Sequence, residues 1–209
     1  MLPEMAMGHQ GTGNGRTPVE GAAPGRTPAG CRVYAVGDIH GRADLLRRLH
    51  GQIRDDAEDT PELRKVVVYV GDYVDRGPDS FGVIEMLIHK PLEGFERHHL
   101  KGNHEDALLG FLDDFTAGAG WLQFGGDATL YSYGVQLAGL SREQRTMIEA
   151  QLTLRENMPE SHLAFLRGLE SHHRIGDYFF AHAGVRPGVP LDKQATEDLI
   201  WIRDVFLKS

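Results

Sequence analysis

Three short segments of this chain contain the residue types that a metal-dependent reaction needs. They are residues 37–41 (Gly-Asp-Ile-His-Gly), residues 71–77 (Gly-Asp-Tyr-Val-Asp-Arg-Gly) and residues 102–105 (Gly-Asn-His-Glu). Each segment follows an apolar run that is typical of a strand, and each contains glycine, which allows tight turns and close backbone approach. Carboxylate, imidazole and amide donors at successive strand ends suit a pair of divalent metal ions.

The spacing of these donors indicates how two ions could be shared. Asp38 and His40 lie two residues apart on an extended segment, so their side chains can leave on the same side. Asp72 could bridge two ions through its two carboxylate oxygens. Asn103 and His182 offer an oxygen and an imidazole to the second ion.

The remaining polar residues of the segments could act on a phosphate ester. His104 follows Asn103 directly and could serve as general acid for the leaving oxygen. Asp75 could orient His104 and raise its pKa, and Arg76 could hold phosphate. A hydroxide shared by the two ions would attack phosphorus in line. Glu105 is expected to help start a helix, where acidic residues suit the helix dipole.

In this order the three segments resemble the metallophosphoesterase superfamily, specifically its phosphoprotein phosphatase branch. Residues 121–135 and 180–190 extend the resemblance to bacterial and phage-type serine/threonine phosphatases, so that it covers nearly everything after residue 30. The resemblance implies Asp38, His40 and Asp72 at one metal ion, Asp72, Asn103 and His182 at the other, His104 and Asp75 as acid and partner, and Arg76 as phosphate clamp. It also implies a phosphate contact from Arg203, within a Trp-Ile-Arg segment.

The resemblance implies two divalent metal ions, with manganese expected first and iron, zinc or magnesium also compatible with oxygen and nitrogen ligands. The family has a further metal-binding histidine on a later strand, whereas no histidine follows His182 here. We therefore expect a catalytic domain that is incomplete at its C-terminus and lacks its last strands.

Three functions remain open at this point. The first is a serine/threonine protein phosphatase, acting on phosphoproteins or small phosphoesters. The second is a symmetrical dinucleoside polyphosphate hydrolase, for which the aromatic residues of 121–133 could stack a base, although core packing explains them equally well. The third is an inactive fragment that binds metal or phosphate without turnover.

The elements that must position these residues alternate along the chain. Strands are expected at 33–36, 66–70 and 97–100, each leading into one segment, with helices between them. The first helix should bury Leu45, Leu46, Leu49 and Ile53. Residues 116–139 are expected to be an irregular cap, followed by helices at 141–157 and 161–169, antiparallel strands at 172–175 and 178–181, and a helix at 197–207. The fold class is α/β, a mixed β-sandwich flanked by helices.

The other histidines are not expected to bind metal. His98-His99 and His172-His173 are adjacent pairs on strands, so the two members of each pair point to opposite faces and cannot chelate together.

Composition limits the class of protein further. Residues 1–30 are rich in glycine and proline and are expected to be a disordered tail, with the catalytic domain at 31–209. The net charge of −8 argues against nonspecific nucleic-acid binding. Cys31 is the only cysteine, and neither a membrane span nor a signal peptide is evident, so we expect a cytoplasmic protein. The oligomeric state is open.

Overall fold

A three-stranded parallel sheet forms the centre of the computed structural model, which describes residues 24–136 and 144–209. The strands are β1 (Cys31–Val36), β2 (Arg64–Tyr69) and β3 (Phe95–His99), in the order β1-β2-β3. Helix α1 (Ala43–Glu58) connects β1 to β2, and α2 (Ser80–His89) connects β2 to β3. The register pairs Val36 with Tyr69 and Tyr69 with His99, so the three strands end at one edge of the sheet.

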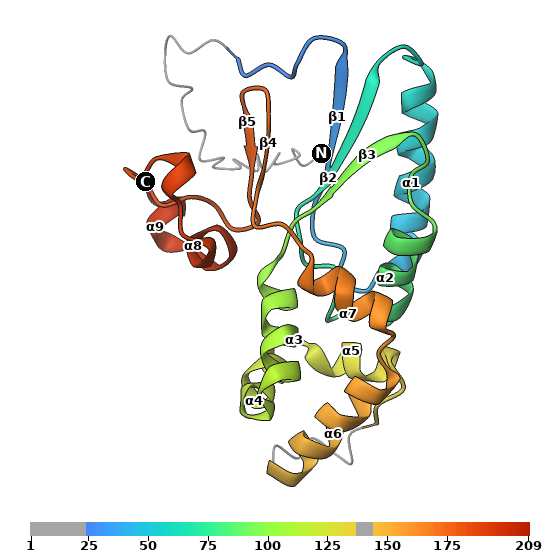
Figure 1. Ribbon diagram of the computed structural model, residues 1–209, viewed down its shortest axis with the longest axis vertical. Coiled ribbons are helices and arrows are strands. Elements are labelled where there is room, and N and C mark those ends of the chain that lie inside the picture. Colours follow the sequence, from blue (N-terminus) through green and yellow to red (C-terminus); the bar gives the residue numbers. More distant parts are fainter. Residues whose placement is uncertain (1–23, 137–143) are drawn as a thin grey trace, which may run out of the picture.

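The central strand is covered on both faces, as its continuous apolar run predicts. Val67 and Tyr69 belong to the larger hydrophobic core, together with buried residues of α1 and α2. Val66 and Val68 face a smaller core that includes Ile175. Figure 1 shows the two layers: α1 and α2 lie on one side of the sheet, and a hairpin lies on the other.

The hairpin consists of β4 (His173–Ile175) and β5 (Tyr178–Phe180), which pair antiparallel as predicted. Its turn holds Gly176 at a φ of 59°, a conformation that glycine adopts without a steric penalty. The mixed α/β class expected from the sequence is therefore confirmed within the described residues.

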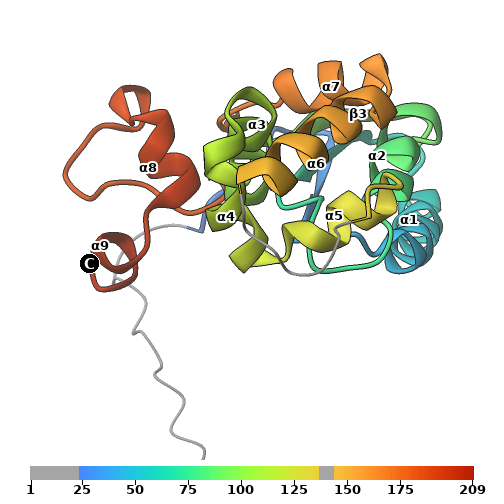
Figure 2. The same cartoon turned by 90° about the horizontal axis from the view of Figure 1, so that it is seen from below.

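Helices complete the molecule below and beside the sheet (Figures 1 and 2). They are α3 (Asn103–Asp113), η1 (Phe115–Ala117), α4 (Gly118–Trp121), η2 (Leu122–Phe124), α5 (Gly126–Ser132), α6 (Gln144–Asn157), α7 (Glu160–Arg167), η3 (Leu191–Lys193), α8 (Thr196–Trp201) and α9 (Asp204–Leu207). Every helix of the described residues is too short or too polar to span a membrane.

Three local expectations were wrong. Leu45 is largely exposed, while Leu46 and Ile53 of the same predicted stripe are buried. The described part of 116–139 consists mainly of short helices rather than irregular loop; each is too short to show a helical period in the sequence. The predicted helix at 197–207 is broken, because Ile202 is buried with extended backbone and the chain turns at Arg203.

Most of the predicted tail, residues 1–23, lies outside the described residues. The last residues of that segment contact the hairpin turn. The backbone N–H of Arg26 donates to a carboxylate oxygen of Asp177 at 3.0 Å, and its carbonyl accepts from the Asp177 N–H at 3.0 Å. The Tyr178 hydroxyl donates to the carbonyl of Gly25.

Candidate metal centre

The three polar segments meet at the end of the sheet where the carboxyl ends of the parallel strands lie. The backbone N–H groups of Ile39 and His40 both donate to the carbonyl of Asp72 at 2.9 Å, which joins the first segment to the second. Among the described residues, the non-glycine residues with positive φ are His40, Asp72, Asp75 and Arg76. Such backbone is costly for residues with a Cβ atom, and its concentration at one place is typical of functional sites.

Glycines allow the loops to approach this closely. A Cβ atom on Gly77 would collide with the carbonyl oxygen of His40, and one on Gly102 would collide with the backbone nitrogen and carboxylate of Asp72. The first and third segments are thus both packed against the second at contact distance.

Glu105 holds the second and third segments together. Its carboxylate is completely buried and accepts from the backbone N–H groups of Asp72, Tyr73, Val74 and Gly102 at 2.7–3.2 Å. Burial raises the pKa of Glu105 to about 7, with the charge of Asp72 acting in the same direction. The sequence predicted only a helix-starting role. Glu105 does accept from the backbone N–H of Gly102, just before α3. Its bonds to the N–H groups of residues 72–74, however, join two loops that are distant in the sequence.

Asp38, His40 and Asp72 form the first group of donors. The Nε2 atom of His40 lies 3.8 Å from an oxygen of Asp38 and 3.7 Å from an oxygen of Asp72. The other ring nitrogen lies 2.8 Å from the carbonyl of Val74, to which it can donate. His40 Nε2 is buried and has no hydrogen-bonding partner among the described residues. An unpaired buried nitrogen between two carboxylates fits a metal ligand.

His182 and Asn103 form the second group, on the other side of Asp72. His182 Nε2 lies 3.0 Å from the side-chain oxygen of Asn103 and 3.4 Å from an oxygen of Asp72. Its Nδ1 atom lies 2.8 Å from the carbonyl of Val70. Asp72 therefore has one carboxylate oxygen toward each group. Donor atoms close enough to hold an ion form two sets that share Asp72, one with His40 and His104 and the other with Asp38 and His182, so the donors fit two divalent ions.

His104 and Asp75 form a buried pair beside the donors, 2.7 Å apart. The two oxygens of Asp75 also accept from the Trp121 indole at 2.8 Å and from the Thr129 hydroxyl at 2.6 Å. Burial acts to lower the pKa of His104, but the hydrogen bond to Asp75 and the charges of Asp72 and Asp75 outweigh it, so the pKa is raised.

Trp121 and Thr129 were not predicted as site residues. Both follow the three segments by many residues, and the short helices α4 and α5 bring them back to Asp75. Trp121 is buried and stacked on Phe111, which agrees with the core-packing interpretation rather than base stacking.

Both predicted arginines reach the same cleft. One terminal nitrogen of Arg76 donates to Nε2 of His104 at 3.0 Å, and one of Arg203 donates to the side-chain oxygen of Asn103 at 3.0 Å. The cleft has a volume of about 560 Å³. Its walls contain Asp38, Asp72, Arg76, Asn103, His104, Phe124, His182, Ala183, Trp201, Ile202, Arg203 and Leu207.

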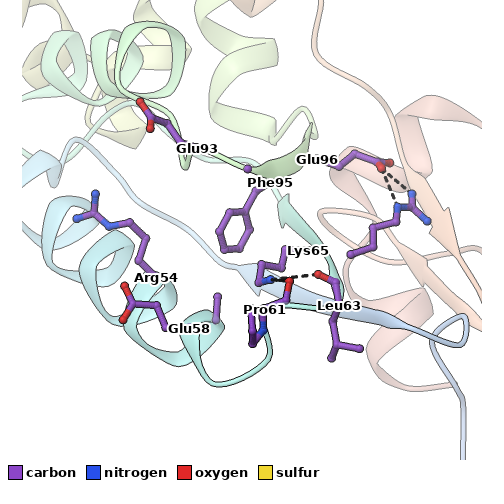
Figure 3. Close-up of a pocket in the computed structure, with 11 residues that line it drawn as sticks. Arg54, Glu58, Pro61, Leu63, Lys65, Glu93, Phe95 and Glu96 are labelled. Atoms are coloured by element: carbon purple, nitrogen blue, oxygen red, sulfur yellow. Dashed lines mark hydrogen bonds and ion pairs between the residues drawn. The ribbon is translucent and has the colours of Figure 1, made fainter.

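A second hollow, of about 670 Å³, lies at the other end of the sheet, where β2 and β3 begin (Figure 3). Its wall includes Phe95 and Lys65 from the beginnings of β3 and β2. The ammonium of Lys65 already donates to the backbone carbonyls of Thr60, Pro61 and Leu63. None of the predicted site residues lines this hollow, so the candidate site is the cleft at the carboxyl ends of the strands.

Comparisons with known proteins identify relatives of this chain. The family described as calcineurin-like phosphoesterase matches residues 31–207. Serine/threonine-protein phosphatase 1 of Salmonella typhimurium is 31% identical over 183 residues, covering 85% of this chain and 71% of that protein. An asymmetrical bis(5'-nucleosyl)-tetraphosphatase of Oceanobacillus iheyensis is 27% identical, covering 74% of this chain and 56% of that protein.

A symmetrical bis(5'-nucleosyl)-tetraphosphatase of Legionella pneumophila is 38% identical over 79 residues, which cover 38% of this chain and 26% of that protein. The chain thus spans less than two thirds of the length of both tetraphosphatases. Relatives of this chain include protein phosphatases and dinucleotide hydrolases alike.

Proposed function

Since the chain belongs to the calcineurin-like phosphoesterase family, we propose that it is a metal-dependent hydrolase of phosphomonoesters, with phosphoserine and phosphothreonine of proteins as its substrates. The observation that carries this proposal is the unpaired, buried Nε2 atom of His40 between Asp38 and Asp72. In the same cleft, the His104–Asp75 pair is available to move a proton.

Asp38, His40 and Asp72 would hold one divalent ion, and Asp72, Asn103 and His182 would hold the other. The bound ions would act as Lewis acids on phosphate oxygens and lower the pKa of water enough for it to ionise near neutral pH. We propose manganese as the working metal, with iron, zinc and magnesium compatible with the same ligands.

In the proposed mechanism His104 protonates the leaving oxygen of the ester. The hydrogen bond between its Nδ1 atom and Asp75 fixes the ring, so Nε2 is the atom that faces the cleft. A raised pKa keeps more of the imidazole protonated near neutral pH, as a general acid requires. Trp121 and Thr129 position Asp75 and act only through it.

Arg76 would bind the phosphoryl oxygens. Its guanidinium donates to Nε2 of His104 in the structure, and it would turn from that nitrogen to the phosphate when Nε2 takes up the proton. A phosphate held by Arg76 then has its leaving oxygen close to the proton donor. Arg203 would contact the same phosphate from the opposite wall, after leaving the oxygen of Asn103. A guanidinium matches the geometry of phosphate oxygens better than an ammonium does.

A dinucleoside polyphosphate is the second candidate substrate, and one residue of the cleft favours it. Phe124 lines the cleft with 47% of its surface exposed. An exposed aromatic ring beside a phosphate site could stack a nucleobase. Relatives named as bis(5'-nucleosyl)-tetraphosphatases support this alternative to the same degree as the phosphatases support the first.

The localisation proposal rests on cysteine content. Cys31 is the only cysteine and is buried. We propose a reducing, cytoplasmic environment on this ground.

The deciding experiment compares two products under manganese: inorganic phosphate from a phosphothreonine peptide and mononucleotides from diadenosine tetraphosphate. The proposal expects a higher kcat/KM on the peptide, and no turnover of either substrate by an Asp72→Asn variant. Faster cleavage of the dinucleotide would overturn the protein phosphatase assignment in favour of the alternative. Folded, metal-loaded protein without turnover of either substrate would show that this chain binds but does not catalyse.

A further inference from the structure

A second set of metal-ligating side chains lies outside the cleft, where β3 meets the β4–β5 hairpin. His98 comes from β3, Glu170 from the turn after α7, and His173 from the first position of β4. One donor atom from each residue lies within 4.8 Å of the other two. No role in the proposed hydrolysis uses any of them.

The backbone fixes the relative positions of the three residues. The N–H of Glu170 donates to the carbonyl of His99 at 2.9 Å, and the carbonyl of Glu170 accepts from the N–H of Lys101 at 2.8 Å. Residue 170 therefore pairs with the chain just beyond β3, and His173 begins the hairpin three residues later. Ligands that are held by backbone pairing before an ion arrives lose little conformational entropy when they bind it.

The two histidine rings present their edges to one carboxylate. They stack with centroids 3.4 Å apart at an angle of 22°. His98 Nδ1 lies 3.1 Å from one oxygen of Glu170, and His173 Nδ1 lies 3.7 Å from the other. Both imidazoles are largely covered, with side-chain exposures of 17% and 16%. Stacked rings that both carried a positive charge would repel each other at this separation.

Glu96 is the hydrogen-bonding partner of the second ring nitrogen of His98, Nε2. Its carboxylate lies 3.0 Å from Nε2 of His98 and is itself paired with Arg64 at 2.6 Å. Figure 3 shows this ion pair at the edge of the hollow. Glu96 can accept the Nε2–H of His98, and a carboxylate is a usual partner for the non-ligating nitrogen of a histidine that binds a metal. Nδ1, which lies at hydrogen-bonding distance from Glu170, is then the nitrogen at which a metal ion would replace a proton.

A divalent cation among these donors would take the place of the Nδ1 protons of the imidazoles and pair with the carboxylate of Glu170, because a histidine that ligates a metal must be deprotonated at the ligating nitrogen.

We propose that His98, Glu170 and His173 bind a transition-metal ion, with zinc as the best match to two imidazoles and one carboxylate. Glu96 is the positioning residue for His98. Because His98 lies on β3 and His173 on β4, the ion would connect the outer strand of the parallel sheet to the hairpin. That hairpin leads directly into His182, so the ion would steady a ligand of the catalytic cleft without taking part in the reaction.

Equilibrium dialysis of the full chain against zinc, with elemental analysis of ions per chain, tests the proposal. His173→Ala should bind one ion fewer than the unmodified chain. His172→Ala is the matched control: it removes the adjacent, exposed histidine, which stacks on Phe179 instead, and should bind the same number. Glu96→Gln should retain the site with an affinity about 10–100-fold weaker.

Asp72→Asn separates this site from the cleft, because it removes the carboxylate shared by the two catalytic ions. In the Asp72→Asn protein one zinc should remain, and His173→Ala should then abolish it. Circular dichroism establishes that each variant is folded. Equal zinc counts in the His173→Ala and His172→Ala proteins, together with an unchanged count in the double variant His98→Ala and His173→Ala, would overturn the proposal.

Discussion

At the scale of single residues, the partner of one imidazole nitrogen distinguishes the histidines of the cleft. The Nδ1 atoms of His40 and His182 can donate to backbone carbonyls, so that Nε2 is the nitrogen available as a ligand. The Nδ1 atom of His104 faces the carboxylate of Asp75, which instead stabilises the protonated ring. We infer that these partners separate the metal-ligating histidines from the proton donor.

The proton-donor role predicts a dependence on the leaving group. His104→Gln should lower kcat about 10²–10⁴-fold on a phosphothreonine peptide, because the alkoxide leaving group needs a proton. The loss should be much smaller on p-nitrophenyl phosphate, whose phenolate leaves without one. Steady-state kinetics on the two substrates measure the difference. An equal loss on both would assign His104 to phosphate or metal binding instead.

A histidine outside the cleft sets an acid limit on stability. Burial, with the charge of Arg54, lowers the pKa of His50 to about 4, and its Nε2 lies 2.8 Å from the Tyr69 hydroxyl. Below pH 6.5 His50 becomes protonated in the unfolded chain, whereas in the folded chain it stays neutral down to about pH 4. The free energy of unfolding should therefore fall as the pH drops through this window, by up to about 2 kcal/mol at pH 5.

Thermal unfolding between pH 7 and pH 5 measures this contribution. His50→Gln should flatten the pH dependence, whereas His89→Gln, on the exposed end of α2, should leave it unchanged. The assignment to His50 would fail if both variants lost stability as steeply as the unmodified chain.

At the scale of elements, the site depends on loops that interlock rather than on the strands alone. The strands end at one edge, but the positions of the side chains are fixed by backbone contacts between residues 37–41, 71–77 and 102–105. Glu105 ties the second of these loops to the third through four N–H groups. The positive φ angle of Asp72 persists because these bonds offset its cost, and that of Asp75 because its N–H is bound by the hydroxyls of Ser80 and Thr129.

Two glycines of the same region offer a matched test. Gly102→Ala would force a Cβ atom into Asp72 and should destabilise the fold by roughly 3 kcal/mol or more. Gly110→Ala, on α3, meets nothing within 4 Å and should stabilise by about 0.5–1 kcal/mol. Urea unfolding gives both values, and a neutral Gly102→Ala would show that the loops are not packed as tightly as described.

At the scale of the whole molecule, one cleft gathers groups from distant parts of the chain. The loops after β1 and β2 supply Asp38 and Asp72, and the first residue of α3 supplies Asn103. The hairpin leads to His182, and the turn between α8 and α9 supplies Arg203. Figure 2 shows α8 and α9 to one side of the other helices, beside α3. The Trp201 indole fixes this placement by donating to Asp106 of α3 at 2.9 Å.

Metal removal should therefore affect the whole fold as well as activity. The cleft holds Asp38 and Asp72 close together, and bound cations would neutralise them. Chelation of manganese-loaded protein should abolish hydrolysis and lower the Tm by roughly 5–10 °C, as expected for a ligand present at about 100 times its Kd. Manganese should restore both, and an unchanged Tm on chelation would contradict binding in the cleft.

The sequence alone determined the strand–loop–helix alternation and predicted most of the side chains that meet at the cleft. Both depend on local patterns: an apolar run, a glycine turn and polar residues two apart. The same reasoning missed Trp121 and Thr129, the tertiary role of Glu105 and the pairing of His98 with His173. Those contacts join residues 31–75 positions apart. The periodicity of a single helix or strand carries no information about contacts between residues so far apart in the sequence. These contacts depend on how the helices and the hairpin pack against the sheet.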